Sequence, residues 1–476
     1  MTTDEARHLQ RRLAFASTPL VASGGMSVDA AFNRLFSDSQ RAGLPAPPDA
    51  VRTTWTNTAL RTPGMSDPQY DTLRAEQLAA HRRDIDVIRL WWLREMVAGA
   101  APLRENLTLF FEATFGGSTE LVDIPHAIHG RNALIRRLCL GTIPALLDSL
   151  VTDPAMLIQI GMDEHFKARV SDRPAKLILD HWTVGAGAYA DTDVENLSRA
   201  LTGWRLEAAP GQRLTTMPDP AAARPARRTG LHATFVAEQA DARNKTILGT
   251  TANFDARSAM RLLARHPATA RRFSERLVRH LGVDGPSDRL VGEMAAVYQS
   301  TGGSVEAMLR AIVASKEFWS EPSRWSLIKS PVHLAVGACH QLDLVSPPLV
   351  EMNRWLVATG QTLFDTPNNG EGGWPGQEAW VTPPDRLSVR YQLPVVLSGR
   401  MPALGIRAAR TEASASIELP LGRSLANANA KTLVERLDPA PGLDLSSISR
   451  LRSANAASDQ SELIRQVMMT PQYQLA

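Results

Sequence analysis

Apolar residues recur along this chain mainly at three- and four-residue spacing, the period of an amphipathic helix. The apolar stripe of residues 84–97 consists of Ile85, Ile88, Trp92 and Met96. Similar stripes follow Pro102 and Pro267, and the second ends before Gly282. A proline in the first turn suits a helix, because its missing N–H would have no partner there. The pattern therefore predicts helices over most of the chain.

Serines mark the start of two further helices. Ser287 and Ser304 each precede a periodic segment, as an N-capping residue does. The helix after Ser304 is expected to continue to Trp319.

Alternating strand patterns are rare. One short strand pair is suggested near Ala186–Tyr189 and Thr246–Leu248. The predicted fold class is mainly α, with a large helical domain over residues 1–330 and a smaller C-terminal helical subdomain over residues 331–476.

Two segments lack any period. Residues 206–231 are rich in proline, alanine and arginine, which predicts an exposed loop. Residues 368–376 are rich in glycine and contain Trp374, which predicts an irregular loop. Binding residues often lie on loops that a rigid frame holds, so Trp374 and Asn368 are candidate ligand or partner contacts. Trp204 is a further candidate, and its alternative role is to pack against the end of the preceding helix.

Composition and charge exclude several classes. The chain has 476 residues, of which 44% are hydrophobic and 21% charged, as in a globular protein. The net charge of +3 is small, and the densest basic run, residues 224–228, lies in the predicted loop, so no nucleic-acid partner is expected. The two cysteines, Cys139 and Cys339, are too few for a disulfide framework. No long apolar run is present, so we expect no membrane span and a cytoplasmic location.

Several short motifs occur in a fixed order along the chain: Asp153–Leu157, Leu197–Trp204, His266–Ala270 and Gly373–Gly376. Together with Arg7–Phe15, this series resembles a bacterial family catalogued as domain of unknown function 1800. The resemblance extends from about Arg7 to the C-terminus. It implies a scaffold and no particular reaction.

The resemblance also shows which polar groups are missing. Typical members place histidines and carboxylates in three motifs, where they could bind a metal or exchange protons. In this chain, the first of these segments, Phe110–Phe115, has no histidine. The second retains one helical acid, Asp180, and the third keeps Asp241 and Lys245 without the histidine. We interpret the chain as a divergent member that has lost most of this chemistry.

Two functions remain open. The first is a catalytically degraded scaffold, or a partner subunit of another protein. The resemblance implies that this partner is similar to the sulfatase/alkaline-phosphatase superfamily. The alternative is an enzyme with a rebuilt site of Glu112, Asp180, Asp241 and Lys245, acting on a polar or anionic substrate. Lys245 would then bind an anionic group or lower a neighbouring carboxylate pKa. In the structural alternative, Asp241 and Lys245 shape a turn and Asp180 pairs with an arginine.

Metal binding has weaker support. His126 and His129 are three residues apart in a helix after Pro125, a spacing that can place two imidazoles on one face. They are weak candidates for a divalent metal, and a solvated or capping pair is the alternative. No other cofactor is predicted.

Overall fold

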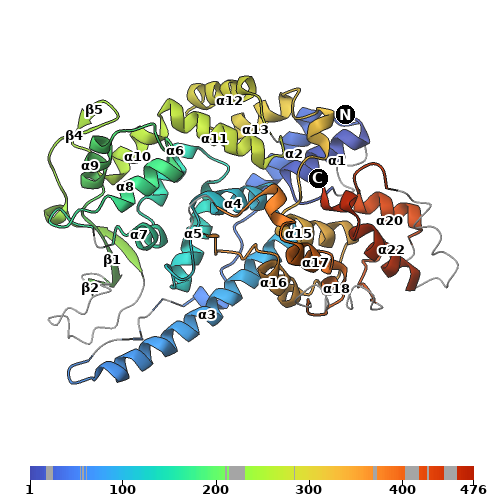
Figure 1. Cartoon of the computed structure of the whole chain (residues 1–476), viewed down its shortest axis with the longest axis horizontal. Coiled ribbons are helices and arrows are strands. Elements are labelled where there is room, and N and C mark those ends of the chain that lie inside the picture. Colours follow the sequence, from blue (N-terminus) through green and yellow to red (C-terminus); the bar gives the residue numbers. More distant parts are fainter. Residues whose placement is uncertain are drawn as a thin grey trace.

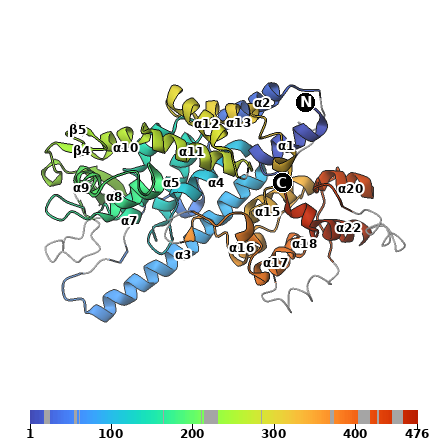
Figure 2. The ribbon, with the colours of Figure 1, turned by 45° about the horizontal axis from the view of Figure 1, so that its top comes forward.

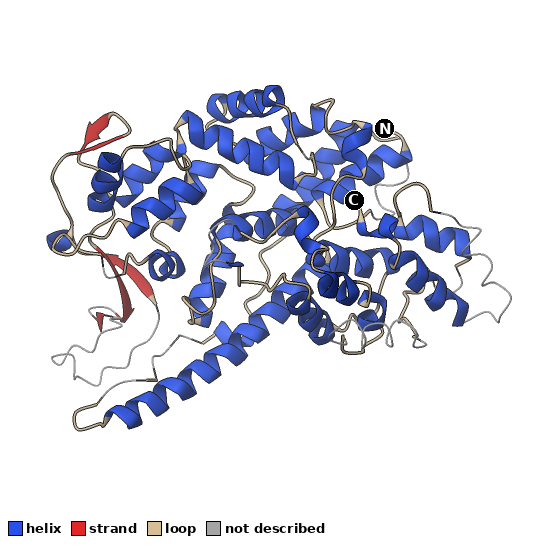
Figure 3. Cartoon of the chain, in the orientation of Figure 1, coloured by secondary structure: helices blue, strands red, loops and turns tan. Residues whose placement is uncertain are grey.

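Helices make up most of the computed structural model (Figures 1 and 3), so the predicted mainly α fold is confirmed. The structure describes residues 1–17, 25–53, 55, 58–59, 62–163, 165–209, 212–213, 231–283, 285–367, 373–402, 417–425, 428–443 and 458–476.

The structure has the following helices up to residue 200, several of which begin at a proline or a capping residue. They are α1 (Thr3–Leu13), α2 (Val28–Arg41), η1 (Asp49–Val51), α3 (Asp67–Ala98), α4 (Pro102–Phe115), α5 (Pro125–Leu138), α6 (Ile143–Leu150), α7 (Pro154–Ile160), α8 (Arg173–Leu177), η2 (Ile178–Trp182) and α9 (Asp191–Ala200). Prolines occupy the first turn of α4 to α7, where no backbone donor is lost. The stripe of residues 84–97 lies in α3, which is longer than predicted because a capping box at Ser66 starts it earlier.

The later helices include three that start where the sequence predicted, at Pro267 and after Ser287 and Ser304. The helices after residue 200 are η3 (Ala237–Gln239), α10 (Ala256–Ala264), α11 (Pro267–His280), α12 (Asp288–Ser300), α13 (Val305–Ala314), α14 (Glu321–Arg324), α15 (Pro331–Leu342), α16 (Leu349–Ala358), η5 (Gln377–Trp380), α17 (Pro384–Arg390), α18 (Leu393–Leu397), α20 (Ala430–Leu437), α22 (Ser458–Met468) and η6 (Pro471–Gln474). Ser287 and Ser304 cap α12 and α13 as predicted. The helix after Ser304 ends at Ala314, short of the predicted Trp319, because Ser315 adopts an extended conformation.

Two small antiparallel sheets correct the strand predictions. Strand β1 (Trp204–Ala209) pairs with β2 (Gln212–Arg213) and β3 (His232–Phe235). The prediction of an exposed loop from residue 206 was therefore wrong at its start, where Leu206 is buried; residues 210–211 and 214–230 lie outside the described part.

The second sheet is a hairpin of β4 (Lys245–Ile247) and β5 (Thr250–Ala252). A strand near residues 246–248 is thus confirmed, but its partner is β5. Residues 186–189 form turns and bends instead.

The buried apolar residues form two clusters on either side of α4, which lies near the middle of the molecule in both ribbon views (Figures 1 and 2). The first cluster joins α1, α2 and α4 to α13. The second joins the C-terminal half of α3 with α15, α16, α18, α20 and α22. Helix α3 precedes residue 330, so the second cluster crosses the predicted boundary. Whether the two parts are separable domains stays a prediction.

No single helix within the described ranges is long and apolar enough to cross a membrane; α6 and α7 meet that criterion only as a pair, across a bend of 73°.

Candidate functional site

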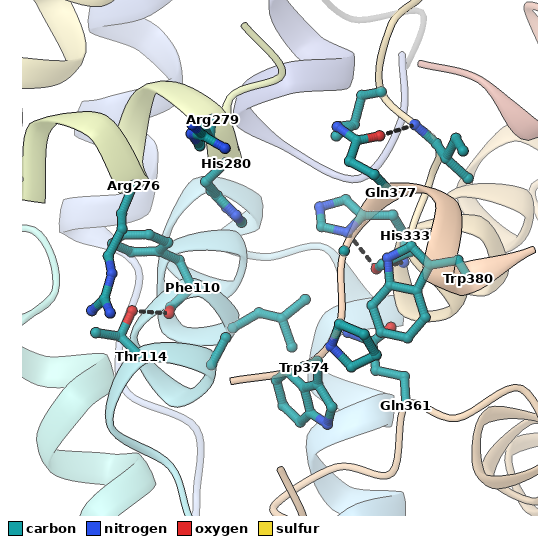
Figure 4. Close-up of a pocket in the computed structure, with 17 residues that line it drawn as sticks. Phe110, Thr114, Arg276, Arg279, His280, His333, Gln361, Trp374, Gln377 and Trp380 are labelled. Carbon is teal, nitrogen blue, oxygen red and sulfur yellow. Dashed lines mark hydrogen bonds between the residues drawn. The ribbon is translucent and has the colours of Figure 1, made fainter. Parts of the chain in front are cut away.

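A cavity of about 480 Å³ lies where α4, α11 and α15 meet the segment that carries Trp374 (Figure 4). Arg276, Phe110 and Thr114 lie on one side of it, and Trp374 and Trp380 lie on the other. The described residues that line it are Leu109, Phe110, Ala113, Thr114, Arg276, Arg279, His280, Leu327, Ile328, Ser330, His333, Gln361, Trp374, Pro375, Gly376, Gln377 and Trp380. Its size and its mixture of aromatic and polar groups are typical of a small-molecule site.

Helical spacing explains which side chains reach the cavity. In α11, Arg276, Arg279 and His280 are three and four residues apart and share one face. In α4, Phe110 and Thr114 have the same relation. Helices α4 and α11 thus each present one short face to the same space.

Trp374 is held in place by the glycine that precedes it. Gly373 has a φ of +74°, and a Cβ at this position would lie 2.2 Å from the carbonyl oxygen of Ala113. Only glycine fits such a close approach to α4. Trp374 is buried, and its Nε1–H donates to the carbonyl oxygen of Asp365 at 3.2 Å. The indole of Trp374 therefore lines the cavity from a fixed position.

A hydrogen-bond network fixes the tautomers of the two histidines. The Nδ2 group of Asn106 donates to the carbonyl oxygen of Arg12 at 3.1 Å, which orients the amide. Its Oδ1 atom lies 3.0 Å from Nε2 of His280 and 3.1 Å from Nε2 of His333. Because an amide oxygen only accepts, both imidazoles carry a proton on Nε2. Their Nδ1 atoms are therefore acceptors.

The two Nδ1 atoms differ in their surroundings. The Ser330 hydroxyl lies 2.9 Å from Nδ1 of His333 and donates to it, and the same hydroxyl caps α15 by accepting from the His333 N–H. The described residues provide no hydrogen-bond partner for Nδ1 of His280. One acceptor of the pair is thus occupied and the other is available at the cavity.

Burial keeps both imidazoles neutral. It lowers the pKa of His280 to about 4, and burial together with nearby positive charge lowers the pKa of His333 to about 3. A general base works best with a pKa near the operating pH. His333 therefore orients the Ser330 hydroxyl without activating it at neutral pH.

The cavity is positively charged. Arg276 donates through Nη1 to the carbonyl oxygen of His181 at 2.8 Å and forms no ion pair with any described carboxylate. Burial, with the nearby charge of Arg272, lowers its pKa to about 10, so it remains cationic at neutral pH. Arg279 pairs with Glu275 at 2.9 Å and is half exposed. No aspartate or glutamate occurs among the described lining residues.

Glu112 lies inside the protein, on the face of α4 that contacts α5. It is fully buried, and its carboxylate accepts from Arg131 and Asn132, each at 3.2 Å. Arg131 also donates to Gln159 at 3.0 Å. The described contacts of Glu112 are thus those of a buried structural ion pair.

Asp241 and Lys245 lie together, as the sequence suggested, at the start of the β4–β5 hairpin. Hydrogen bonds from Arg243 and Arg199 hold the pKa of the Asp241 carboxyl far below its usual range. Lys245 is buried, which lowers its pKa, and its ammonium group donates to backbone carbonyls, including that of Phe254 at 2.8 Å. These contacts match the alternative in which the two residues shape a turn.

Asp180 lies in η2 and accepts from the Tyr189 hydroxyl at 2.7 Å. No described contact joins it to Glu112, Asp241 or Lys245. The four predicted catalytic residues therefore occupy three separate environments in the described structure.

The histidine pair and Trp204 lie away from the cavity. His126 bonds the carbonyl oxygen of Thr53 at 2.6 Å, and the ring of His129 packs on Trp91 at 5.0 Å. The described residues contain no group of three histidine, cysteine, aspartate or glutamate side chains suited to a metal ion. Trp204 starts β1 and packs on Phe235 at 5.5 Å, in place of the predicted return onto the preceding helix. Asn368 lies outside the described residues.

A family model described as protein of unknown function (DUF1800) matches residues 8–475. The chain belongs to the DUF1800 family. No curated protein and no solved structure matches it. DUF1800 membership confirms the resemblance seen in the sequence and leaves the activity to be argued from this chain's own residues.

The cavity borders the segment that resembles the first DUF1800 polar motif, Phe110–Phe115. The ring of His280 lies 4.9 Å from that of Phe110, and His333 lies next to it across Asn106. His280, His333 and Asn106 lie on different helices and were not predicted from the sequence. The spacing of Arg276, Arg279 and His280 could have predicted a shared polar face on α11, which forms one wall of the cavity, but it gives no information about the other walls.

Proposed function

We propose that this chain acts by binding, without catalysis, and that its helical frame takes a small organic anion into the cavity between α4, α11 and α15. The observation that carries the proposal is the charge of the lining: Arg276 has no carboxylate partner among the described residues, Arg279 is paired with Glu275, and no described lining residue is acidic. An arginine without an anionic partner, partly buried in the cavity wall, favours a carboxylate or phosphate.

The rest of the lining suits the organic part of such a ligand. Trp374, Trp380 and Phe110 offer flat apolar surfaces. Aromatic walls with a few placed polar groups are common in small-molecule sites. We therefore expect a ring-bearing anion to bind better than inorganic phosphate.

The contacts of the predicted catalytic residues support binding over catalysis. Glu112 and Asp241 are already neutralised by arginines, and Lys245 donates to backbone carbonyls. Ser330 has a histidine beside it, but the low pKa of His333 makes it a poor base. The role of scaffold or partner subunit stays a prediction, as does a partner similar to the sulfatase/alkaline-phosphatase superfamily.

The proposal is tested by titrating the purified chain with benzoate, phenyl phosphate, inorganic phosphate and neutral benzamide, using calorimetry. We expect the two aryl anions to bind and benzamide to bind at least tenfold more weakly. Arg276→Gln should weaken the aryl anions by about tenfold, as expected for loss of a charged hydrogen bond. Arg271→Gln is the matched control, because Arg271 lies on the same helix and pairs with exposed Asp288 outside the cavity. Equal binding of benzoate and benzamide would contradict the proposal.

A further inference from the structure

The cavity has a second polar feature besides its positive charge, the hydrogen-bond acceptor of His280. Asn106 uses its Nδ2 group on the Arg12 carbonyl, so its Oδ1 atom faces both imidazoles. This leaves each ring with a proton on Nε2 and a lone pair on Nδ1. The tautomer therefore follows from the contacts of one amide.

The two lone pairs are not equivalent. That of His333 is taken by the Ser330 hydroxyl at 2.9 Å. That of His280 has no partner among the described residues, although the side chain lines the cavity. An acceptor left without a partner on ligand binding would weaken the complex, because a buried polar group without a hydrogen bond is unfavourable.

We infer that the ligand is an aryl or other ring-bearing anion that also carries a hydrogen-bond donor, and that His280 Nδ1 accepts from this O–H or N–H while Arg276 holds the anionic group. The inference rests on the proposed function and adds the specificity of the same cavity. His280 is the specificity-determining residue, and Asn106 is a positioning residue that sets its tautomer.

Other donors and acceptors around the cavity agree with this assignment. Gln361 is committed to the backbone N–H of Val332 at 2.8 Å, and Gln377 to that of Ile328 at 3.2 Å. Thr114 donates to the carbonyl oxygen of Phe110 at 2.9 Å. The Oε1 atoms of both glutamines and the hydroxyl proton of Thr114 thus have internal partners, and the glutamine Nε2 groups can only donate, whereas His280 keeps an acceptor nitrogen without a partner among the described residues.

The test compares probes that differ only in the donor: 3- and 4-hydroxybenzoate against 3- and 4-methoxybenzoate and benzoate. We expect at least one hydroxybenzoate to bind about tenfold more tightly than its methoxy counterpart. His280→Phe should abolish this preference, and the readout is the ratio of hydroxybenzoate to methoxybenzoate affinity in the same variant. His333→Phe is the matched control, since it removes the same bond to Asn106 but leaves the acceptor of His280, so the preference should persist.

Nitrogen NMR of the unmodified protein gives a readout that does not depend on any variant folding. Neutral His280 protonated on Nε2, with an Nδ1 signal that shifts when hydroxybenzoate is added, would support the inference. A proton on Nδ1 of the free protein would overturn it. Anions that bind through Arg276 without any preference for a donor would overturn the inference and leave the proposed function standing. Failure of every aryl anion to bind would overturn both.

Discussion

Replacing Glu112 separates a structural role from a catalytic one. Glu112 is fully buried and faces Arg131, whose side chain is 1% exposed, and Asn132. The substitution Glu112→Gln keeps the shape and removes the charge. If Glu112 were a catalytic acid, activity would fall while stability changed little. If it is a structural ion, stability will fall.

The expected decrease in the free energy of unfolding follows from the contacts that Arg131 keeps after the substitution. Arg131 keeps its bond to Gln159 at 3.0 Å and the nearby buried Asp153, but it loses the carboxylate to which it donates directly. Breaking a buried ion pair by removing one partner costs about 3–5 kcal/mol. The introduced glutamine side chain would still accept one hydrogen bond, which places the expected loss near the lower end, at about 3 kcal/mol.

The assay is urea denaturation followed by circular dichroism and by tryptophan fluorescence, and the free energy of unfolding is interpreted where the two transitions coincide. The double variant Glu112→Met/Arg131→Met should recover most of the loss, because well-packed apolar residues can replace a buried ion pair at little cost. Asp288→Asn is the control: it breaks an exposed pair and should cost less than about 1 kcal/mol. A loss below about 1 kcal/mol for Glu112→Gln would refute the structural assignment.

Two further outcomes follow from the cavity. The pKa values of His280 and His333, about 4 and about 3, lie below the ordinary value near 6.5, so the unfolded chain binds more protons in acid and stability falls as the pH drops from about 6.5 towards 4. Each histidine should contribute on the order of 1–2 kcal/mol to this loss of stability. The double variant His280→Gln/His333→Gln should therefore show a smaller change in urea midpoint between pH 7.5 and pH 5 than the unmodified protein. An equal change in the two proteins would contradict the conclusion that both imidazoles are neutral when folded. Gly373→Ala should push Trp374 out of place, since its Cβ would meet the Ala113 carbonyl at 2.2 Å. We expect loss of benzoate binding and at least about 1 kcal/mol of stability, checked by calorimetry and urea denaturation, and wild-type affinity would argue against Trp374 as a wall of the site.

Local signals in the sequence predicted the helices well, because prolines and capping serines act on their own turn. Pro102 and Pro267 start α4 and α11, and Ser287 and Ser304 cap the helices that follow them. Strand β1 was missed because its pairing is decided by β3, more than twenty residues further along the chain. Propensity in a short window contains no information about such a partner.

The site shows the same division between local and long-range information. Trp374 was predicted as a loop residue that could contact a ligand, and it lies in the cavity wall. This prediction was possible because the glycines before Trp374 are a local sign of irregular backbone, and Gly373 has a positive φ. The acceptor of His280 could not be predicted in this way. It depends on an amide on α4 that is oriented by a carbonyl on α1 and shared with an imidazole on α15.

The tautomer of His280 is therefore set only when α1, α4 and α15 have packed against α11. The histidines expected at the first motif are absent from Phe110–Phe115, whereas His280 and His333 reach this segment from α11 and α15, which belong to different apolar clusters. The proposed ligand therefore rests on the residues that α1, α4, α11 and α15 bring together, and not on the motif residues Glu112, Asp180, Asp241 and Lys245.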